Sequence, residues 1–234
     1  MAIDAKKVLD QFLNSGVATG MVAGWLGGGL MRRSGLGGIA RIGGLALVGT
    51  LAYQAWQRYQ AQQAELPPEQ RGEGWRSKVG GVVANLPGMD EFLNTAQDDK
   101  KAAHAGFASN ALPEPQQNKL GVALLTAMIS AAKADGEVDQ AESQRIVGQM
   151  EQAGLSSDEK SLVLSELAKP LNVDDVAKHA ATPEIAAQIY TASAIVIDQA
   201  SDSERDYLAA LAERMKLDQV FVEELNRQVK ALNP

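Results

Sequence analysis

The stretch TPEIAAQIYTASAIVIDQASDSERDYLAAL, residues 182–211, carries the clearest structural signals in this chain. Thr182 stands immediately before Pro183 and Glu184, a combination that is typical of the first turn of a helix. The apolar periodicity that follows predicts one long helix that continues through Ile197. Ser201 then begins a second helix as its N-cap, because a glutamate stands three residues later in the position of a capping box.

The same kind of pattern extends outward through residues 116–234. Leu120, Leu124 and Met128 are spaced as one face of a helix that begins near Gln116. Further helices are predicted from a start at Asp139, from Ser157 or Asp158 to the stop at Pro170, and in the segments NVDDVAKHA, SDSERDYLAALAERM and LDQVFVEELNRQVKAL. No convincing strand pattern interrupts them. The sequence therefore predicts an all-α domain, a bundle of about seven helices joined by short turns.

Charge is distributed unevenly along the chain. Residues 1–112 contain eleven Lys and Arg against nine Asp and Glu, whereas residues 113–234 contain eleven against twenty. Because an acidic domain repels phosphate groups, no nucleic-acid partner is expected. The chain has no cysteine, and its two histidines, His104 and His179, are far apart in sequence. These counts argue against thiol chemistry, a histidine-centred triad and a zinc site rich in histidine.

The amino-terminal region contains an uncharged run from Phe12 to Met31. As a helix, this run would be about 30 Å long, which matches the hydrocarbon core of a bilayer. Gly16, Gly20, Gly24 and Gly28 fall four residues apart and would form a glycine zipper, a flat face through which helices associate in lipid. Membrane lipid and a second copy of this helix are therefore the expected partners of this run.

A second uncharged run, Ile42 to Gln57, would be about 24 Å long as a helix, which is short for a full span. Tyr53, Trp56 and Tyr59 would form an interfacial aromatic belt. The sequence leaves a helical hairpin and a single span open, and a flexible Gly-rich leader is the further alternative. On the membrane interpretation, residues 1–59 form an anchoring segment.

Residues 60–115 are expected to be a Pro- and Gln-rich linker, because five prolines between 67 and 115 break any long helix. His104 lies in this linker and is expected to be solvated. Residues 116–234 then form the acidic helical domain.

Two stretches of that domain resemble each other. ADGEVDQAESQRIV, residues 134–147, aligns with VIDQASDSERDYLA, residues 196–209, at a constant offset of 62 residues. Each copy is a helix end, an acidic turn and a capped helix start. If the two helix pairs pack face to face, the two acidic turns meet.

The segments AAKADGEVDQAE and ASAIVIDQASDSERDYLAALA resemble the TerB-like domain of tellurite-resistance proteins, over residues 117–232. With its Gly-rich hydrophobic amino terminus, the whole chain resembles the YebE-like inner-membrane proteins. The resemblance implies a bacterial inner-membrane location with the carboxy-terminal domain in the cytoplasm. It also implies a link to envelope or chemical stress rather than a defined catalytic activity.

The resemblance further implies a divalent-metal site formed by the two acidic turns. Carried over by position, the candidate ligands are Asp135, Asp139, Glu142, Asp198, Asp202 and Glu204. The second turn lacks the glycine that follows Asp135 in the first, so it departs from the pattern of a matched pair. Carboxylates favour Ca²⁺, Mg²⁺ or Mn²⁺. The alternative is a purely structural role, in which Asp139 and Ser201 are N-caps and Glu142 and Glu204 complete capping boxes.

Three classes of function follow from these features. The leading expectation is a membrane-tethered helical domain that acts as a stress-associated scaffold or sensor, with a bound divalent cation. The alternative is a metal-independent acidic adaptor that docks a basic protein partner through electrostatic complementarity. An enzyme is the third and weakest, because the acidic domain shows no phosphate-cradling loop, sugar platform or nucleophile motif.

Overall fold

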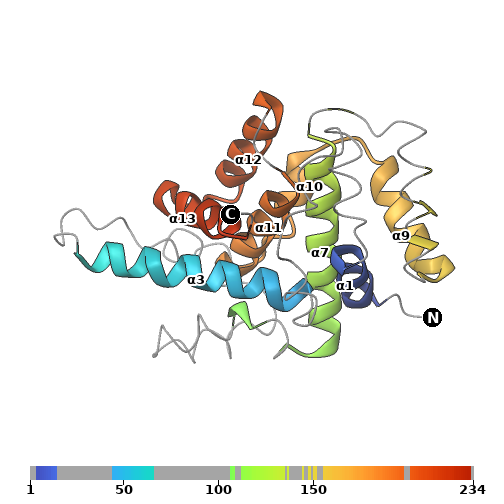
Figure 1. Cartoon of the computed structure of the whole chain (residues 1–234), viewed down its shortest axis with the longest axis horizontal. Coiled ribbons are helices and arrows are strands. Elements are labelled where there is room, and N and C mark those ends of the chain that lie inside the picture. Colours follow the sequence, from blue (N-terminus) through green and yellow to red (C-terminus); the bar gives the residue numbers. More distant parts are fainter. Residues whose placement is uncertain are drawn as a thin grey trace.

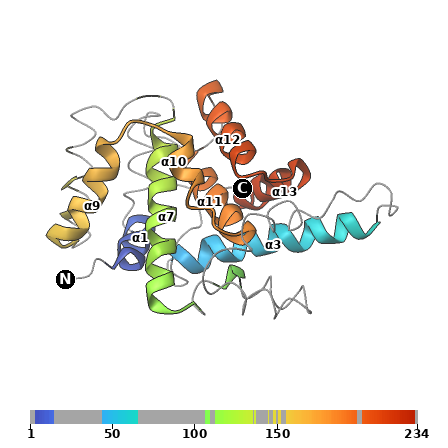
Figure 2. The same cartoon turned by 180° about the vertical axis from the view of Figure 1, so that it is seen from behind.

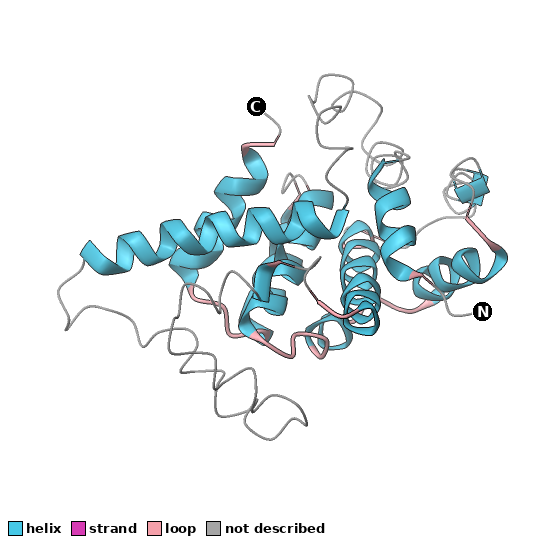
Figure 3. Ribbon diagram, turned by 90° about the horizontal axis from the view of Figure 1, so that it is seen from below, coloured by secondary structure: helices cyan, strands magenta, loops and turns pink. Residues whose placement is uncertain are grey.

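The structure is a computed structural model that describes residues 4–14, 44–65, 106–108, 112–134, 136, 144, 147–148, 150–151, 155–197 and 201–232. The described residues form α-helices and contain no strand (Figure 3). The helices are α1 (Ala5–Asn14), α3 (Gly44–Glu65), α7 (Glu114–Ala132), α9 (Ser157–Ala168), α10 (Val173–Ala177), α11 (Pro183–Val196), α12 (Asp202–Arg214) and α13 (Gln219–Lys230). The predicted all-α fold class is confirmed for this part of the chain.

Helix α11 occupies the centre of the fold. All of its residues are buried except Ile185 and Ile195, which are half-buried. It packs against α7, α3, α12 and α13. Helix α7 in turn has α1 and α9 on one side and α11 on the other (Figures 1 and 2). A helix that is buried on every face is stable only when other elements surround it, as they do here.

Side-chain caps fix where the carboxy-terminal helices begin. Thr182 caps α11, with its hydroxyl accepting from the backbone N–H of Ile185 at 3.3 Å. Ser156, Asn172, Ser201 and Asp218 cap α9, α10, α12 and α13 in the same way. These are the starts that the sequence pattern predicts, because Ser, Thr, Asn and Asp satisfy backbone donors that a helix leaves unpaired.

The apolar face of α3 lies in the protein core. Val48, Ala52 and Trp56 are buried, and the ring of Tyr59 lies 5.3 Å from that of Phe221 on α13. α3 packs along α13 and α11. This finding corrects the aromatic belt expected for the second uncharged run, and it argues against the helical hairpin, which the sequence left open beside a single span. Its apolar side chains are covered by other helices of the same chain.

Within the part of the chain that the structure describes, no helix combines the length and the apolar character needed to cross a bilayer. The other candidate span, Phe12–Met31, lies outside the described residues beyond Asn14, and so do Gly16, Gly20, Gly24 and Gly28.

The segment expected to be a linker also contributes to the core. α3 continues to Glu65, and α7 begins at Glu114 rather than at Gln116. Between them, Phe107 is buried, and its ring lies 5.9 Å from that of Tyr53 and 6.5 Å from that of Trp56. The described residues of 1–65 thus share one core with the acidic domain, whereas the sequence predicted separate segments. His104 lies outside the described residues.

Helix α1 is docked along α7. Ala5, Val8 and Leu9 are buried, and the backbone N–H of Ala5 donates to Oδ1 of Asn118 at 2.5 Å. A β-carbon added at Gly121 would come within 3.0 Å of the α1 backbone, so the missing side chain permits this close approach. On the other side of α1, Nζ of Lys7 lies 3.3 Å from Oε1 of Glu159 on α9.

The buried contact between α3 and Phe107 makes Gly49 sensitive to substitution. A β-carbon added at Gly49 would collide with the carbonyl oxygen of Phe107, a backbone atom that cannot rotate away. A β-carbon added at Gly148 would have no described atom within 4 Å, so this glycine serves as the control. We predict that Gly49→Ala destabilises the fold by about 1–3 kcal/mol, as overpacking does. Gly148→Ala should be neutral or stabilising by up to about 1 kcal/mol.

Urea unfolding followed by circular dichroism measures both variants against the parent. Equal midpoints for Gly49→Ala and the parent would contradict the packing of Phe107 on α3.

Glu159 links stability to pH. Burial raises the pKa of its carboxyl group, but hydrogen bonds from the backbone and hydroxyl of Ser156 and the nearby ammonium of Lys7 outweigh burial and lower it. A carboxyl group whose pKa is lower in the folded state stabilises the fold above its ordinary pKa, and this stabilisation is lost as the pH falls through the folded-state pKa.

We therefore predict that Glu159→Gln lowers the free energy of unfolding at pH 7 by about 1 kcal/mol, typical of a lost cap. The difference from the parent should shrink as the pH falls below 4.5, the ordinary value for this group. Urea titrations at pH 7 and pH 3.5 test this, with the exposed Glu213→Gln as control. If the difference in free energy of unfolding between Glu159→Gln and the parent is the same at both pH values, the proposed link between Glu159 and pH is wrong.

Candidate functional site

Two of the six candidate metal ligands lie in the described part of the chain. Asp202 is the first residue of α12 and Glu204 is its third. The other four, Asp135, Asp139, Glu142 and Asp198, lie outside the described residues. Among described residues no group of three or more acidic or histidine side chains is placed to hold a metal ion. The six-carboxylate site therefore remains a prediction.

Glu204 has a structural role at the start of α12. Its Oε2 accepts from the backbone N–H of Ser201 at 3.1 Å, and its own backbone N–H donates to Oγ of Ser201 at 3.1 Å. This reciprocal pair is the capping box that the sequence predicted. The Glu204 side chain is buried against the helix end, while Asp202 is fully exposed and pairs with Arg205.

The helices that lead into the two acidic turns run parallel. Near their amino-terminal ends, Lys119 and Ala123 of α7 line the same pocket as Thr182 and Ile185 of α11. Near their carboxyl-terminal ends, Oγ of Ser193 donates to the backbone carbonyl of Ala127 at 3.4 Å. α7 ends at Ala132 and α11 ends at Val196. Both helices therefore end on the same side of the fold, just before the two acidic turns.

Lys133 follows the last residue of α7 and is buried. Its ammonium group donates to the backbone carbonyls of Leu167, at 3.0 Å, and of Lys169 at the end of α9. Unpaired carbonyls at a helix end carry partial negative charge, so a cation is stabilising there. Lys133 thereby fixes the end of α9 beside the end of α7.

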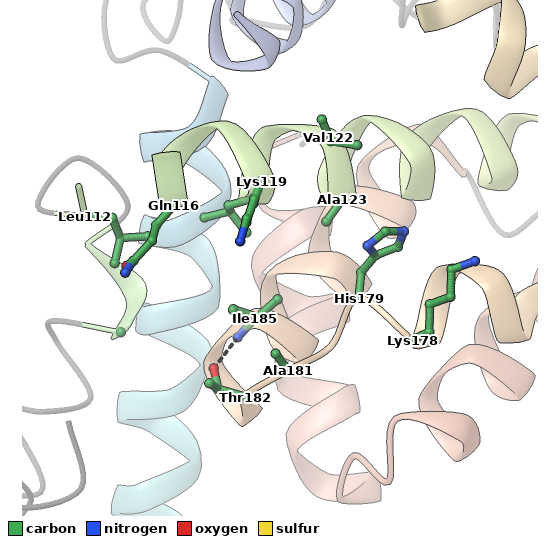
Figure 4. A pocket seen from close by; sticks show the side chains of 12 residues that line it. Leu112, Gln116, Lys119, Val122, Ala123, Lys178, His179, Ala181, Thr182 and Ile185 are labelled. Atoms are coloured by element: carbon green, nitrogen blue, oxygen red, sulfur yellow. Dashed lines mark hydrogen bonds between the residues drawn. The ribbon is translucent and has the colours of Figure 1, made fainter. Parts of the chain in front are cut away.

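A pocket of about 560 Å³ opens where α7 passes the segment between α10 and α11. Figure 4 shows that its lining comes from the first half of α7, from Lys178 and His179 at the end of α10, and from the start of α11. The volume lies within the ~300–1,000 Å³ range of small-molecule sites. The apolar part of its lining consists of Leu112, Leu120, Val122, Ala123, Ala181 and Ile185.

Three side chains of basic residues line this pocket, from Lys119, Lys178 and His179, beside the amide of Gln116. Nζ of Lys178 is paired with Oδ1 of Asp175 at 2.8 Å. Lys119 makes no ion pair with any described residue, and its side chain is exposed at the pocket rim. Lys119 therefore supplies a positive charge to the pocket that no described carboxylate neutralises.

His179 is half-buried in the pocket wall. Burial lowers its pKa from the ordinary value, and the positive charge of Lys178 lowers it further, against an opposing contribution from Glu166. The imidazole is therefore neutral at pH 7 and offers one hydrogen-bond donor and one acceptor. His179 directly follows Lys178, the C-cap of α10.

Tyr190 and Tyr207 are both buried in the core. Burial raises the pKa of each phenol to about 12. The hydroxyl of Tyr190 is hydrogen-bonded to the side chain of Asn226 at 3.0 Å. Both phenol hydroxyls therefore stay protonated at neutral pH, and the two side chains contribute to packing of the core.

Comparison with known proteins gives a family. The family described as "Protein of unknown function (DUF533)" matches residues 12–229. The chain belongs to this family. It is also 34% identical over 96 residues to the "Uncharacterized protein in ampR 5'region" of Yersinia enterocolitica, which covers 41% of this chain and 69% of that relative. No solved structure matches the chain. The TerB-like and YebE-like resemblances go further than this family match and remain proposals.

The pocket was missed by sequence reasoning. Its lining residues come from three separated stretches around Gly106, Leu112–Ala123 and Lys178–Ile185. None of these stretches contains a recognisable motif, because ordinary Leu, Ala and Lys residues become a site only when the fold brings them together. The nearest signal in the sequence is Lys119, a lysine that stands directly before the apolar run that begins at Leu120.

Proposed function

We propose that this protein is a membrane-tethered, TerB-like helical domain that acts as a stress-associated sensor or scaffold and is not an enzyme. In this proposal the two acidic turns together hold one divalent cation. The observation that carries it is the parallel packing of α7 and α11, whose ends at Ala132 and Val196 lie on the same side of the fold. Turns that follow two such ends start close together.

The charge at these helix ends favours a cation. The last carbonyls of a helix carry partial negative charge, and two parallel helices that end together add their contributions. Carboxylates from the two turns would supply oxygen ligands, which Ca²⁺, Mg²⁺ and Mn²⁺ prefer. The capping role of Glu204 is compatible with this, because only one of its two carboxylate oxygens is needed by Ser201.

The membrane part of the proposal rests on Phe12–Met31 alone, because α3 packs in the core. α1 is still helical at Asn14, so a described helix leads directly into this uncharged run. In this proposal the run anchors the chain in a bacterial inner membrane with the helical domain in the cytoplasm.

The cation proposal predicts that the full chain melts at higher temperature in millimolar Mn²⁺, Ca²⁺ or Mg²⁺ than in NaCl of the same ionic strength. A ligand that binds only the folded state adds about 2.7 kcal/mol at a hundred times its dissociation constant. Asp135→Asn and Asp198→Asn should each remove most of this response. Asp206→Asn, an exposed carboxylate of α12 outside the turns, is the matched control. Differential scanning calorimetry of the full chain measures the shift.

The full chain is required because α1 and α3 share the core of the acidic domain. Identical melting of the parent with and without divalent ions would refute the site and leave the metal-independent adaptor as the favoured function. Loss of the response in Asp135→Asn alone would assign the cation to one turn.

The membrane proposal predicts that the intact chain sediments with membranes after lysis without detergent. The double variant Val22→Arg and Leu26→Arg should move it to the supernatant, because each central arginine costs about 2.5–3.5 kcal/mol on insertion. Val22→Leu with Leu26→Val preserves hydrophobicity and serves as the control. Recovery of the intact parent in the supernatant would refute the anchor.

A further inference from the structure

The pocket between α7 and the start of α11 has the composition of a site for an anionic amphiphile. We propose that it binds a single-chain carboxylate of medium length, the chemistry of a free fatty acid, with the alkyl chain against the apolar wall and the carboxylate at Lys119. The proposal concerns a site near the amino-terminal ends of α7 and α11, whereas the acidic turns follow their carboxyl-terminal ends, and it does not depend on the cation.

The apolar wall accounts for the alkyl chain. Leu120 and Ala123 on α7 are buried, and Leu112, Val122 and Ile185 are half-buried around them. These side chains offer no hydrogen-bonding groups, so a ligand that lies on them gains by removing apolar surface from water. The pocket volume of about 560 Å³ is in the range of sites that enclose small organic molecules.

The arrangement of charges accounts for a head group with one negative charge. Lys178 is already neutralised by Asp175, so Lys119 is the cation at the rim that no described carboxylate pairs. His179, neutral at pH 7, can donate one hydrogen bond. A carboxylate has one charge and two acceptor oxygens, which matches one ammonium and one neutral donor. A phosphate dianion would leave one charge uncompensated.

The location also favours an amphiphile over a fully enclosed apolar ligand. Gln116 and Lys119 are exposed. Leu120 and Ala123, which follow Lys119 within about one turn of α7, are buried. Figure 4 shows Lys119 directed into the space between α7 and the Thr182–Ile185 segment. A ligand can therefore keep its charged end in water at the rim while its chain lies against the buried residues.

Isothermal titration of the full chain with decanoate, kept below its micelle threshold, tests the proposal. Decanoate should bind, and decyltrimethylammonium, which has the same chain and the opposite charge, should bind at least about tenfold more weakly. Decyl phosphate should bind no more tightly than decanoate. Tighter binding of the ammonium or the phosphate compound, or no binding of decanoate, would overturn the proposal.

Variants locate the ligand. Lys119→Glu should weaken decanoate about tenfold, since it removes an attraction and adds a repulsion at a partly exposed site. The melting temperature should stay near that of the parent, because Lys119 is exposed and makes no ion pair with the described residues. Lys230→Glu, an exposed lysine on α13 outside the pocket, is the matched control and should bind like the parent.

Ala181 is exposed at the pocket, so Ala181→Trp should fill the pocket without unfolding the protein. It should abolish binding of decanoate and also of 1-decanol, the uncharged compound with the same alkyl chain. Non-specific uptake of decanoate by the apolar run of residues 12–31 would survive this substitution. Parent-like affinity in Ala181→Trp or in Lys119→Glu would therefore overturn the proposal.

Discussion

The burial of α11 is the constraint on which the rest of the fold depends. Its residues are mostly small, and they allow neighbouring helices to approach closely on every side. Its buried polar side chains are satisfied by backbone carbonyls. Oγ1 of Thr191 donates to the carbonyl of Ala187 at 2.8 Å, and Nε2 of Gln188 donates to the carbonyls of Glu184 in the same helix and of the distant Gly106. Because α11 cannot be exposed to water on any face, α7, α3, α12 and α13 must be assembled around it.

The helix boundaries of the carboxy-terminal half were predictable because they are set by local chemistry. Ser156, Thr182 and Ser201 cap their helices with their own side chains, so each start is encoded within four residues. The environment of α3 was not predictable in this way. An uncharged helix is equally suited to lipid and to a protein core, and the residues that cover it, Phe107 and Phe221, are distant in sequence.

The candidate sites differ in the same respect. The acidic turns are visible in the sequence because each is a compact repeat of carboxylates, although the structure describes only Asp202 and Glu204 among the six. The pocket has no such signature, because Lys119 and His179 come to line one pocket only through the packing of α7 beside the segment that leads into α11. The pocket is lined by basic residues although the domain as a whole is acidic, so the net charge of the domain gives no sign of it.

The buried ammonium of Lys133 connects parts of the fold that are separate in the sequence. This side chain holds the last carbonyls of α9, while the Lys133 backbone carbonyl accepts from the N–H of Gly136 at 3.2 Å. One residue therefore belongs both to the turn after α7 and to the attachment of α9. α9 is tied in turn through Glu159 to Lys7 of α1. Polar contacts therefore run from Lys133, at the end of α7, through α9 to the amino-terminal helix.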